Sequence, residues 1–139
     1  MRFFPLLPLL FTTRPTVNLT LCDSPSSLLQ NIRYSVHPDP PNIGAPLDLA
    51  FSGDLQERVD HGTIKIKVVL NHFLTVYSSE LDLCDSLKDT DLTCPLSTGH
   101  LEVQAKPDIP SLVPHGDYSV YLEIYSDKPI TCMNAELTL

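Results

Sequence analysis

The sequence predicts an all-β sandwich of about seven antiparallel strands. Apolar and polar residues alternate in six separate segments, and clusters of glycine and proline divide these segments from one another. Alternation places successive side chains on opposite faces of a strand, so each segment offers one face to a core and one face to water. No segment has the long 3.6-residue apolar period of an amphipathic helix. Two sheets packed face to face would bury all of these apolar faces.

The first three expected strands lie at residues 32–36, 47–51 and 63–70. In the third, Lys65 and Lys67 take the outward positions, as is typical of a strand with one solvated face. The inward positions of the three segments are Ile32, Tyr34, Val36, Leu47, Leu49, Phe51, Ile64, Ile66 and Val68.

The other three expected strands lie at residues 100–105, 117–126 and 133–139. Their inward positions are Leu101, Val103, Tyr118, Val120, Leu122, Ile124, Met133, Ala135, Leu137 and Leu139. Glycine and proline clusters predict loops at the strand ends. These loops are 37–46, 95–99, 107–116 and 127–129.

Composition limits the classes of function. With 139 residues, 42% apolar and 19% charged, the chain has the size and apolar content of one domain with its own core. Its net charge is -8 and its pI is near 4.8. This acidity argues against nucleic acid as a partner, and against tight resting contact with an anionic membrane surface.

The stretch "MRFFPLLPLLF" predicts a secretory signal peptide over residues 1–17, which leaves one domain at 18–139. Pro5 and Pro8 interrupt the apolar run and no small-residue cleavage site follows, so an unusual N-terminus remains the alternative. The sequence Asn18-Leu19-Thr20 matches the N-glycosylation pattern and places a sugar acceptor at the new N-terminus.

Four cysteines, Cys22, Cys84, Cys94 and Cys132, predict two disulfides in a secreted domain. Three pairings are open. Cys84 and Cys94 flank the polar loop "DSLKDTDLT", which favours a local bridge, and Cys22 and Cys132 would then tie the first strand to the last. A zinc site is disfavoured because the chain has no C-x-x-C and no suitably spaced histidine.

No catalytic or metal-binding pattern is present in the sequence. It has neither the G-x-S-x-G elbow nor a glycine-rich phosphate loop, and the acidic loop 82–94 lacks the glycine and closing glutamate of a calcium loop. The histidines are near predicted turns or strand edges, as solvated side chains would be. They are His37, His61, His72, His100 and His115. We therefore expect neither an enzyme nor a cofactor.

The inward residues, mostly aliphatic with no tryptophan, allow two interiors. They can interdigitate into a solid core, or the two sheets can separate around an apolar cavity. Residue pattern alone favours the solid core, and with it an extracellular interaction module.

Ordered landmarks along residues 22–137 resemble the ML lipid-recognition domains. The segments are "LCDSP", "HPDPPNIGAPLDLAFSGDL", "ERVDHGTIKIKVVL", "LDLCDSLKDTDLTCPLSTG" and "IPSLVPHGDYSVYLEIYSDKPITC". They are most similar to the branch of fungal phosphatidylglycerol/phosphatidylinositol transfer proteins, relatives of the Niemann–Pick type C soluble sterol carrier. Each motif is loose alone, and the order and spacing carry the resemblance.

The resemblance implies an immunoglobulin-like sandwich splayed around a lipid cavity, which reverses the preference for a solid core. It implies non-enzymatic binding and transfer of a sterol or phospholipid, and the disulfides Cys22–Cys132 and Cys84–Cys94. The implied lipid-binding residues are Tyr34, Leu49, Phe51, Ile64, Ile66, Val68, Phe73, Val76, Tyr77, Leu101, Val103, Ile109, Leu112, Val113, Tyr118, Val120 and Leu122.

One departure concerns the loop "HPDPPN", where the animal sterol carriers have a third disulfide and this chain has none. The ligand class of the animal branch therefore does not carry over. We expect loops 73–79 and 109–116 to touch membranes transiently. We also expect a monomer of the secretory route, either secreted or in a vacuolar or lysosomal lumen.

Overall fold

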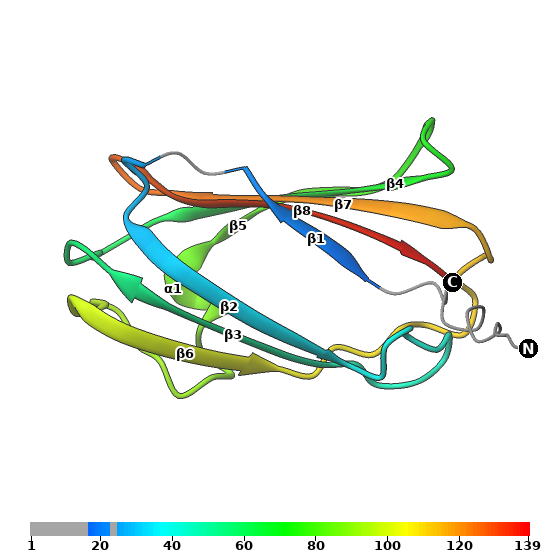
Figure 1. The fold of residues 1–139 in the computed structure, drawn as a ribbon, viewed down its shortest axis with the longest axis horizontal. Coiled ribbons are helices and arrows are strands. Elements are labelled where there is room, and N and C mark those ends of the chain that lie inside the picture. The colour runs from blue at the N-terminus through cyan, green and yellow to red at the C-terminus, as the bar shows by residue number, and fades with distance from the viewer. Residues whose placement is uncertain (1–16, 23–24) are drawn as a thin grey trace, which may run out of the picture.

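The computed structural model describes residues 17–22 and 25–139, which form two antiparallel sheets packed face to face (Figure 1). The larger sheet has the strand order β1-β8-β7-β4-β5, and the smaller has the order β2-β3-β6. The expected all-β sandwich is confirmed, with eight strands in the described residues. Their bounds are β1 (Asn18–Leu21), β2 (Leu29–His37), β3 (Asp48–Leu55), β4 (Thr63–Leu70), β5 (Leu74–Asp82), β6 (Gly99–Ala105), β7 (Asp117–Tyr125) and β8 (Pro129–Thr138).

The six segments expected from alternation correspond to β2, β3, β4, β6, β7 and β8. Several run further than the alternation does. β3 continues to Leu55 across Gly53, where a Cβ atom would lie 2.9 Å from the Cδ1 atom of Leu29. The glycine therefore lets a leucine of the neighbouring strand pack against the β3 backbone.

The structure corrects the expectation of a loop at residues 73–79, because residues 74–79 belong to β5. The reason is a β-bulge. Val68 pairs with Tyr77 and Val69 pairs with Thr75, so Val76 is an extra residue on β5. A bulge shifts the side-chain alternation by one position, and the period-two pattern that identifies a strand is lost there.

The sequence also did not indicate β1 or the one-turn helix α1 (Leu83–Ser86). β1 has four residues and follows directly on the expected signal peptide. Residues 1–16 lie outside the described part of the chain, so the signal peptide stays a prediction.

The two ends of the sandwich are packed differently. At the end where β3 finishes and β4 and β8 begin, six buried residues form a compact core: Leu28, Leu55, Val59, Leu83, Leu96 and Ile130. Toward the other end, most inward residues are only half-buried. The solid part of the core therefore fills one end of the molecule.

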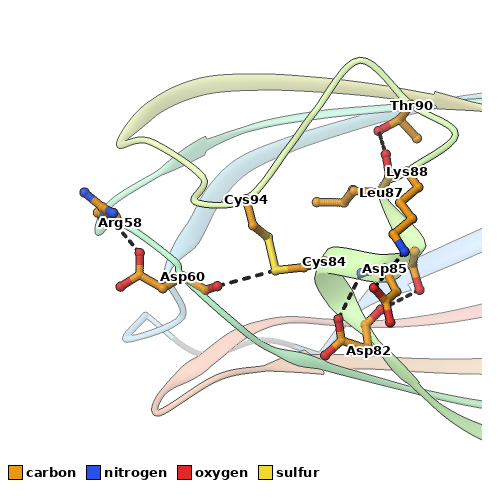
Figure 2. The surroundings of a disulfide bond; sticks show 10 residues. Arg58, Asp60, Asp82, Cys84, Asp85, Leu87, Lys88, Thr90 and Cys94 are labelled. Atoms are coloured by element: carbon orange, nitrogen blue, oxygen red, sulfur yellow. Dashed lines mark hydrogen bonds and ion pairs between the residues drawn. A yellow bond between two sulfur atoms is a disulfide. The ribbon is translucent and has the colours of Figure 1, made fainter.

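Both expected disulfides are present. Cys22, directly after β1, is bonded to Cys132 of β8, and Cys84 of α1 is bonded to Cys94. Figure 2 shows the second bridge closing the loop that carries Leu87 and Thr90. Beside it, the side chain of Asp82 caps α1 by accepting a hydrogen bond from the Asp85 amide at 2.9 Å. The loop is thereby fixed against the compact core.

Candidate functional site

A cavity of about 230 Å³ lies between the two sheets, away from the compact core. We call it the main cavity. Its wall is apolar throughout and comes from both sheets and from the proline-rich loop before β3. The lining residues are Val17, Leu19, Val36, Pro41, Leu47, Leu49, Phe51, Ile66, Val120, Leu122, Met133, Ala135 and Leu137.

Strand register explains why these side chains converge. Residues directly opposite each other in paired strands project from the same face. Leu49 is opposite Val36, while Val120 and Leu19 both flank Ala135 of β8. Alanine at this central position is too short to reach the opposite sheet, which leaves space in the interior.

A second cavity of about 120 Å³ lies within the compact-core end of the sandwich, and four of the six core residues form part of its wall. Leucines of α1 and of the disulfide-closed loop contribute to its wall. The lining residues are Leu29, Phe51, Ser52, Gly53, Leu55, Leu83, Leu87, Leu92, Leu96, Leu101, Val103, Ile124, Ile130 and Thr131. Among the described residues, Phe51 alone belongs to both walls.

Seven of the expected lipid-binding residues line one of these cavities. Leu49, Phe51, Ile66, Val120 and Leu122 line the main cavity. Leu101 and Val103 line the second cavity together with Phe51.

Four other expected residues lie on the strands but outside both cavity walls. Ile64 packs against the compact core, and Val68 is half-buried on β4. Tyr34, on the edge strand β2, is 44% exposed. Tyr118 is buried, and its hydroxyl donates a hydrogen bond of 2.7 Å to the carbonyl oxygen of Pro114. That bond holds the loop before β7 against the sheet.

The expected mouth residues also lie outside the cavity walls. Phe73 is 80% exposed and Leu112 is 92% exposed. Val76 and Tyr77 are exposed on β5, whereas Ile109 and Val113 are half-buried. Phe73 and Leu112 are the two most exposed large apolar side chains in the described part of the chain.

These two side chains lie at the same end of the sandwich, which we call the apolar tip (Phe73 and Leu112). The backbone N–H of Asn71 donates a hydrogen bond of 2.7 Å to the backbone carbonyl oxygen of Asp117. This bond joins the β4–β5 turn to the start of β7, directly after the loop that carries Leu112. That loop is joined in turn to the proline-rich loop, because the Gly44 amide donates to the Ile109 carbonyl at 2.8 Å. The apolar tip therefore adjoins the loop that supplies Pro41 and Leu47 to the main cavity.

Several wall residues of the main cavity were not among the expected lipid-binding set. They are Val17, Leu19, Val36, Pro41, Leu47, Met133, Ala135 and Leu137. Alternation had already placed Val36, Leu47, Met133, Ala135 and Leu137 on inward faces, so that signal was present. Val17 and Leu19 had no such signal because β1 is too short to alternate visibly.

The outer faces carry the charge. On the smaller sheet, Nδ1 of His100 lies 3.1 Å from Asp54 and Nε2 lies 3.1 Å from Glu102. The hydrogen bond to Asp54, then that to Glu102, raises the pKa of His100 above its usual 6.5. The hydrogen bond from Asn31, then that from His100, lowers the pKa of Asp54. This cluster is exposed on the outer face of β3 and β6, the strands whose inward residues line the second cavity.

A larger hollow, of about 530 Å³, lies on the outer face of the five-stranded sheet and is open to solvent. Lys65, Lys67 and Glu80 line it, so it offers an apolar ligand little gain in burial. Within the described part of the chain, no group of three or more histidine, cysteine or acidic side chains is placed to hold a metal ion. In the same residues, no helix reaches the length and apolarity needed to cross a bilayer.

Comparison with known proteins agrees with the fold. The family model of the ML domain matches residues 16–139. The chain belongs to the ML domain family. Phosphatidylglycerol/phosphatidylinositol transfer proteins are among its relatives. That of Aspergillus fumigatus is 36% identical over 84% of this chain and 69% of its own length. That of Kluyveromyces lactis is 36% identical over 86% of this chain and 72% of its own length.

Solved structures show the same fold at lower identity. Chicken MD-1 complexed with lipid IVa is similar with a TM-score of 0.65 and 19% identity, over 88% of each chain. A Niemann-Pick type C2 protein from the Japanese carpenter ant is similar with a TM-score of 0.62 and 16% identity. That match covers 87% of this chain and 98% of the other. The sandwich of this ML domain is therefore the same fold that these solved structures have.

Proposed function

We propose that this ML domain binds the apolar part of a membrane lipid between its sheets and transfers the lipid between membranes. The observation that carries the proposal is the apolar main cavity, whose wall is built from both sheets. Relatives at 36% identity are phosphatidylglycerol/phosphatidylinositol transfer proteins, which supports a phospholipid as ligand. A sterol is the alternative within the same class.

The solid-core interaction module fits the interior less well. Protein cores are packed to the density of organic crystals, with few voids larger than a water molecule. Two apolar cavities of about 230 and 120 Å³ between the sheets depart from that rule. An interior left open in this way is explained by a ligand.

The hydrophobic effect supplies the driving force without any covalent step. At about 25 cal/mol per Å², removing some 400 Å² of lipid surface from water favours binding by roughly 10 kcal/mol before entropic costs. The polar head group has no comparable partner in the apolar wall, so we place it at the cavity mouth, in water. The expected lipid-binding residues that lie outside both cavity walls are proposed to flank the route by which the lipid enters the main cavity.

The apolar tip is proposed as the membrane contact. Phe73 and Leu112 are both exposed. The loops that carry them are linked by hydrogen bonds to the proline-rich loop, which supplies Pro41 and Leu47 to the main cavity. Insertion of two apolar side chains would bring the cavity end of the sandwich to the bilayer. The acidic net charge of -8 makes this contact transient on anionic membranes.

The two disulfides indicate an oxidising compartment. We propose the secretory route, ending outside the cell or in a vacuolar or lysosomal lumen, and a monomer as the transferring unit. Asn18 is exposed on β1, where a sugar would meet no packed neighbour, and its glycosylation stays a proposal.

The proposal is tested first by native mass spectrometry of the purified protein, followed by binding of phosphatidylglycerol, phosphatidylinositol and ergosterol. The decisive variant is Val120→Trp, whose indole would fill the main cavity, so binding of all three lipids should be lost. Tyr121→Trp is the matched control because Tyr121 is the next residue on β7 and faces outward, 43% exposed. If folded Val120→Trp protein still binds, the cavity is not the lipid site.

A further inference from the structure

Phe51 separates the two cavities. It lies in β3, the middle strand of the smaller sheet, opposite Val103 of β6 and Tyr34 of β2. Toward one end of the sandwich its ring borders the main cavity, and toward the other it borders the second cavity. No other described residue is shared by the two walls. The aromatic side chain of Phe51 is therefore a partition between the two apolar cavities.

The main cavity is small for a pocket that binds a ligand. Pockets that bind small molecules usually measure about 300 to 1,000 Å³, and the main cavity, at about 230 Å³, is below that range. A long acyl chain that enters from the apolar tip would fill the main cavity before its end is buried. The space directly beyond the Phe51 ring is the second cavity, of about 120 Å³.

The wall of the second cavity suits the end of a hydrocarbon chain. Half of its lining residues are leucine, including Leu87 and Leu92 of the loop that the Cys84–Cys94 disulfide closes. On the far side it ends at the compact core, where Leu55 and Val59 are each only 2% exposed. A chain that passes Phe51 therefore meets the buried residues of the compact core, which limit the length it can bury.

We infer that the second cavity is the subsite for the terminal methylenes of the ligand's acyl chain, and that Phe51 controls access to it and so sets chain-length preference. This inference rests on the proposed lipid-binding function and names a part of that site. Displacement of the Phe51 ring joins the two cavities, and each methylene then buried strengthens binding by about fourfold.

The test is binding of single-chain lysophosphatidylglycerol carrying an octanoyl, myristoyl or stearoyl chain. Leu101→Trp should fill the second cavity, so the affinity advantage of the stearoyl over the octanoyl chain should fall by about tenfold or more. Phe51→Ala should raise that advantage because it removes the partition. Leu49→Trp is the matched control: it narrows only the main cavity and should weaken all three chain lengths by a similar factor.

Folding of each variant is checked by its thermal transition, and the opposite effects of Leu101→Trp and Phe51→Ala keep the conclusion independent of any one variant. A stearoyl-to-octanoyl affinity ratio that stays within about twofold of wild type in both variants would overturn the subsite. Failure of the wild-type protein to bind any of the three lipids would instead contradict the proposed function itself, and the subsite with it.

Discussion

Thr131 has the one buried side-chain polar atom that lacks a hydrogen-bond partner in the described part of the chain. It is 1% exposed, pairs with Ile124, and lines the second cavity from β8. A buried hydroxyl without a partner costs free energy because its hydrogen bonds to water are lost on folding. The methyl group of threonine meanwhile packs like that of valine.

We therefore expect Thr131→Val to stabilise the protein, by on the order of 1 kcal/mol in the free energy of unfolding. Chemical denaturation measures the change. Thr75→Val, at an exposed position of β5, is the control and should change the stability by less. A lower stability of Thr131→Val would mean that the hydroxyl is satisfied by water in the second cavity.

At this scale, alternation was a good guide to which side chains face inward and a poor guide to which face a space. Leu49 and Val120 were predicted inward and line the main cavity, but Ile64 was predicted by the same rule and packs in the core. The difference depends on how far the opposite side chain reaches, as at Ala135, and period two carries no information about that distance. Thr131 was not predicted because a polar residue at an inward position breaks the pattern.

Among the elements, β3 and β6 are joined on their outer face by the His100 cluster. His100 hydrogen-bonds to Asp54 on β3 and to Glu102 on its own strand. Because folding raises the pKa of His100, its contribution to stability is complete below the unfolded value near 6.5 and is lost as the pH rises through the folded value. Because folding lowers the pKa of Asp54, its contribution is lost only in acid, below about 3.8.

His100→Gln should therefore lower the melting temperature more at about pH 5 than at about pH 8, where the wild-type imidazole has lost its extra proton. Differential scanning calorimetry at the two pH values measures the effect. His61→Gln is the comparison variant, since His61 is 3.5 Å from the exposed Asp127 and its pairing ties no two strands together. An equal loss at both pH values would show that the charge on His100 does not stabilise the pairing of β3 with β6.

The elements also show where sequence patterns stop being informative. The alternation of Ile64, Ile66 and Val68 with Lys65 and Lys67 predicts β4 with its observed bounds. Alternation does not identify its neighbour β5 as a strand, because the bulge at Val76 interrupts the period and because β5 is an edge strand with exposed apolar residues. An edge strand has a paired neighbour on one side only. Which strands pair with it depends on residues elsewhere in the chain, so its own sequence does not reveal its position in the sheet.

The whole molecule has a compact core at one end, cavities in its middle, and an apolar tip at the other end. The fold class followed from alternation and turn residues, since both act locally. The open interior did not, because the same aliphatic residues can fill a core or line a cavity. The resemblance to ML domains supplied that expectation.

Charge acts on the molecule as a whole. The five histidines would bring the net charge from -8 to about -3 if all took up protons, so repulsion from an anionic bilayer weakens as the pH falls. Two of them adjoin the apolar tip: His72 precedes Phe73, and His115 lies in the loop that carries Leu112.

We expect lipid transfer to anionic vesicles, followed by fluorescence dequenching, to accelerate from about pH 7 to pH 5. Transfer to neutral vesicles should change little. Equal rates to anionic vesicles across this range would exclude electrostatic control of the membrane contact.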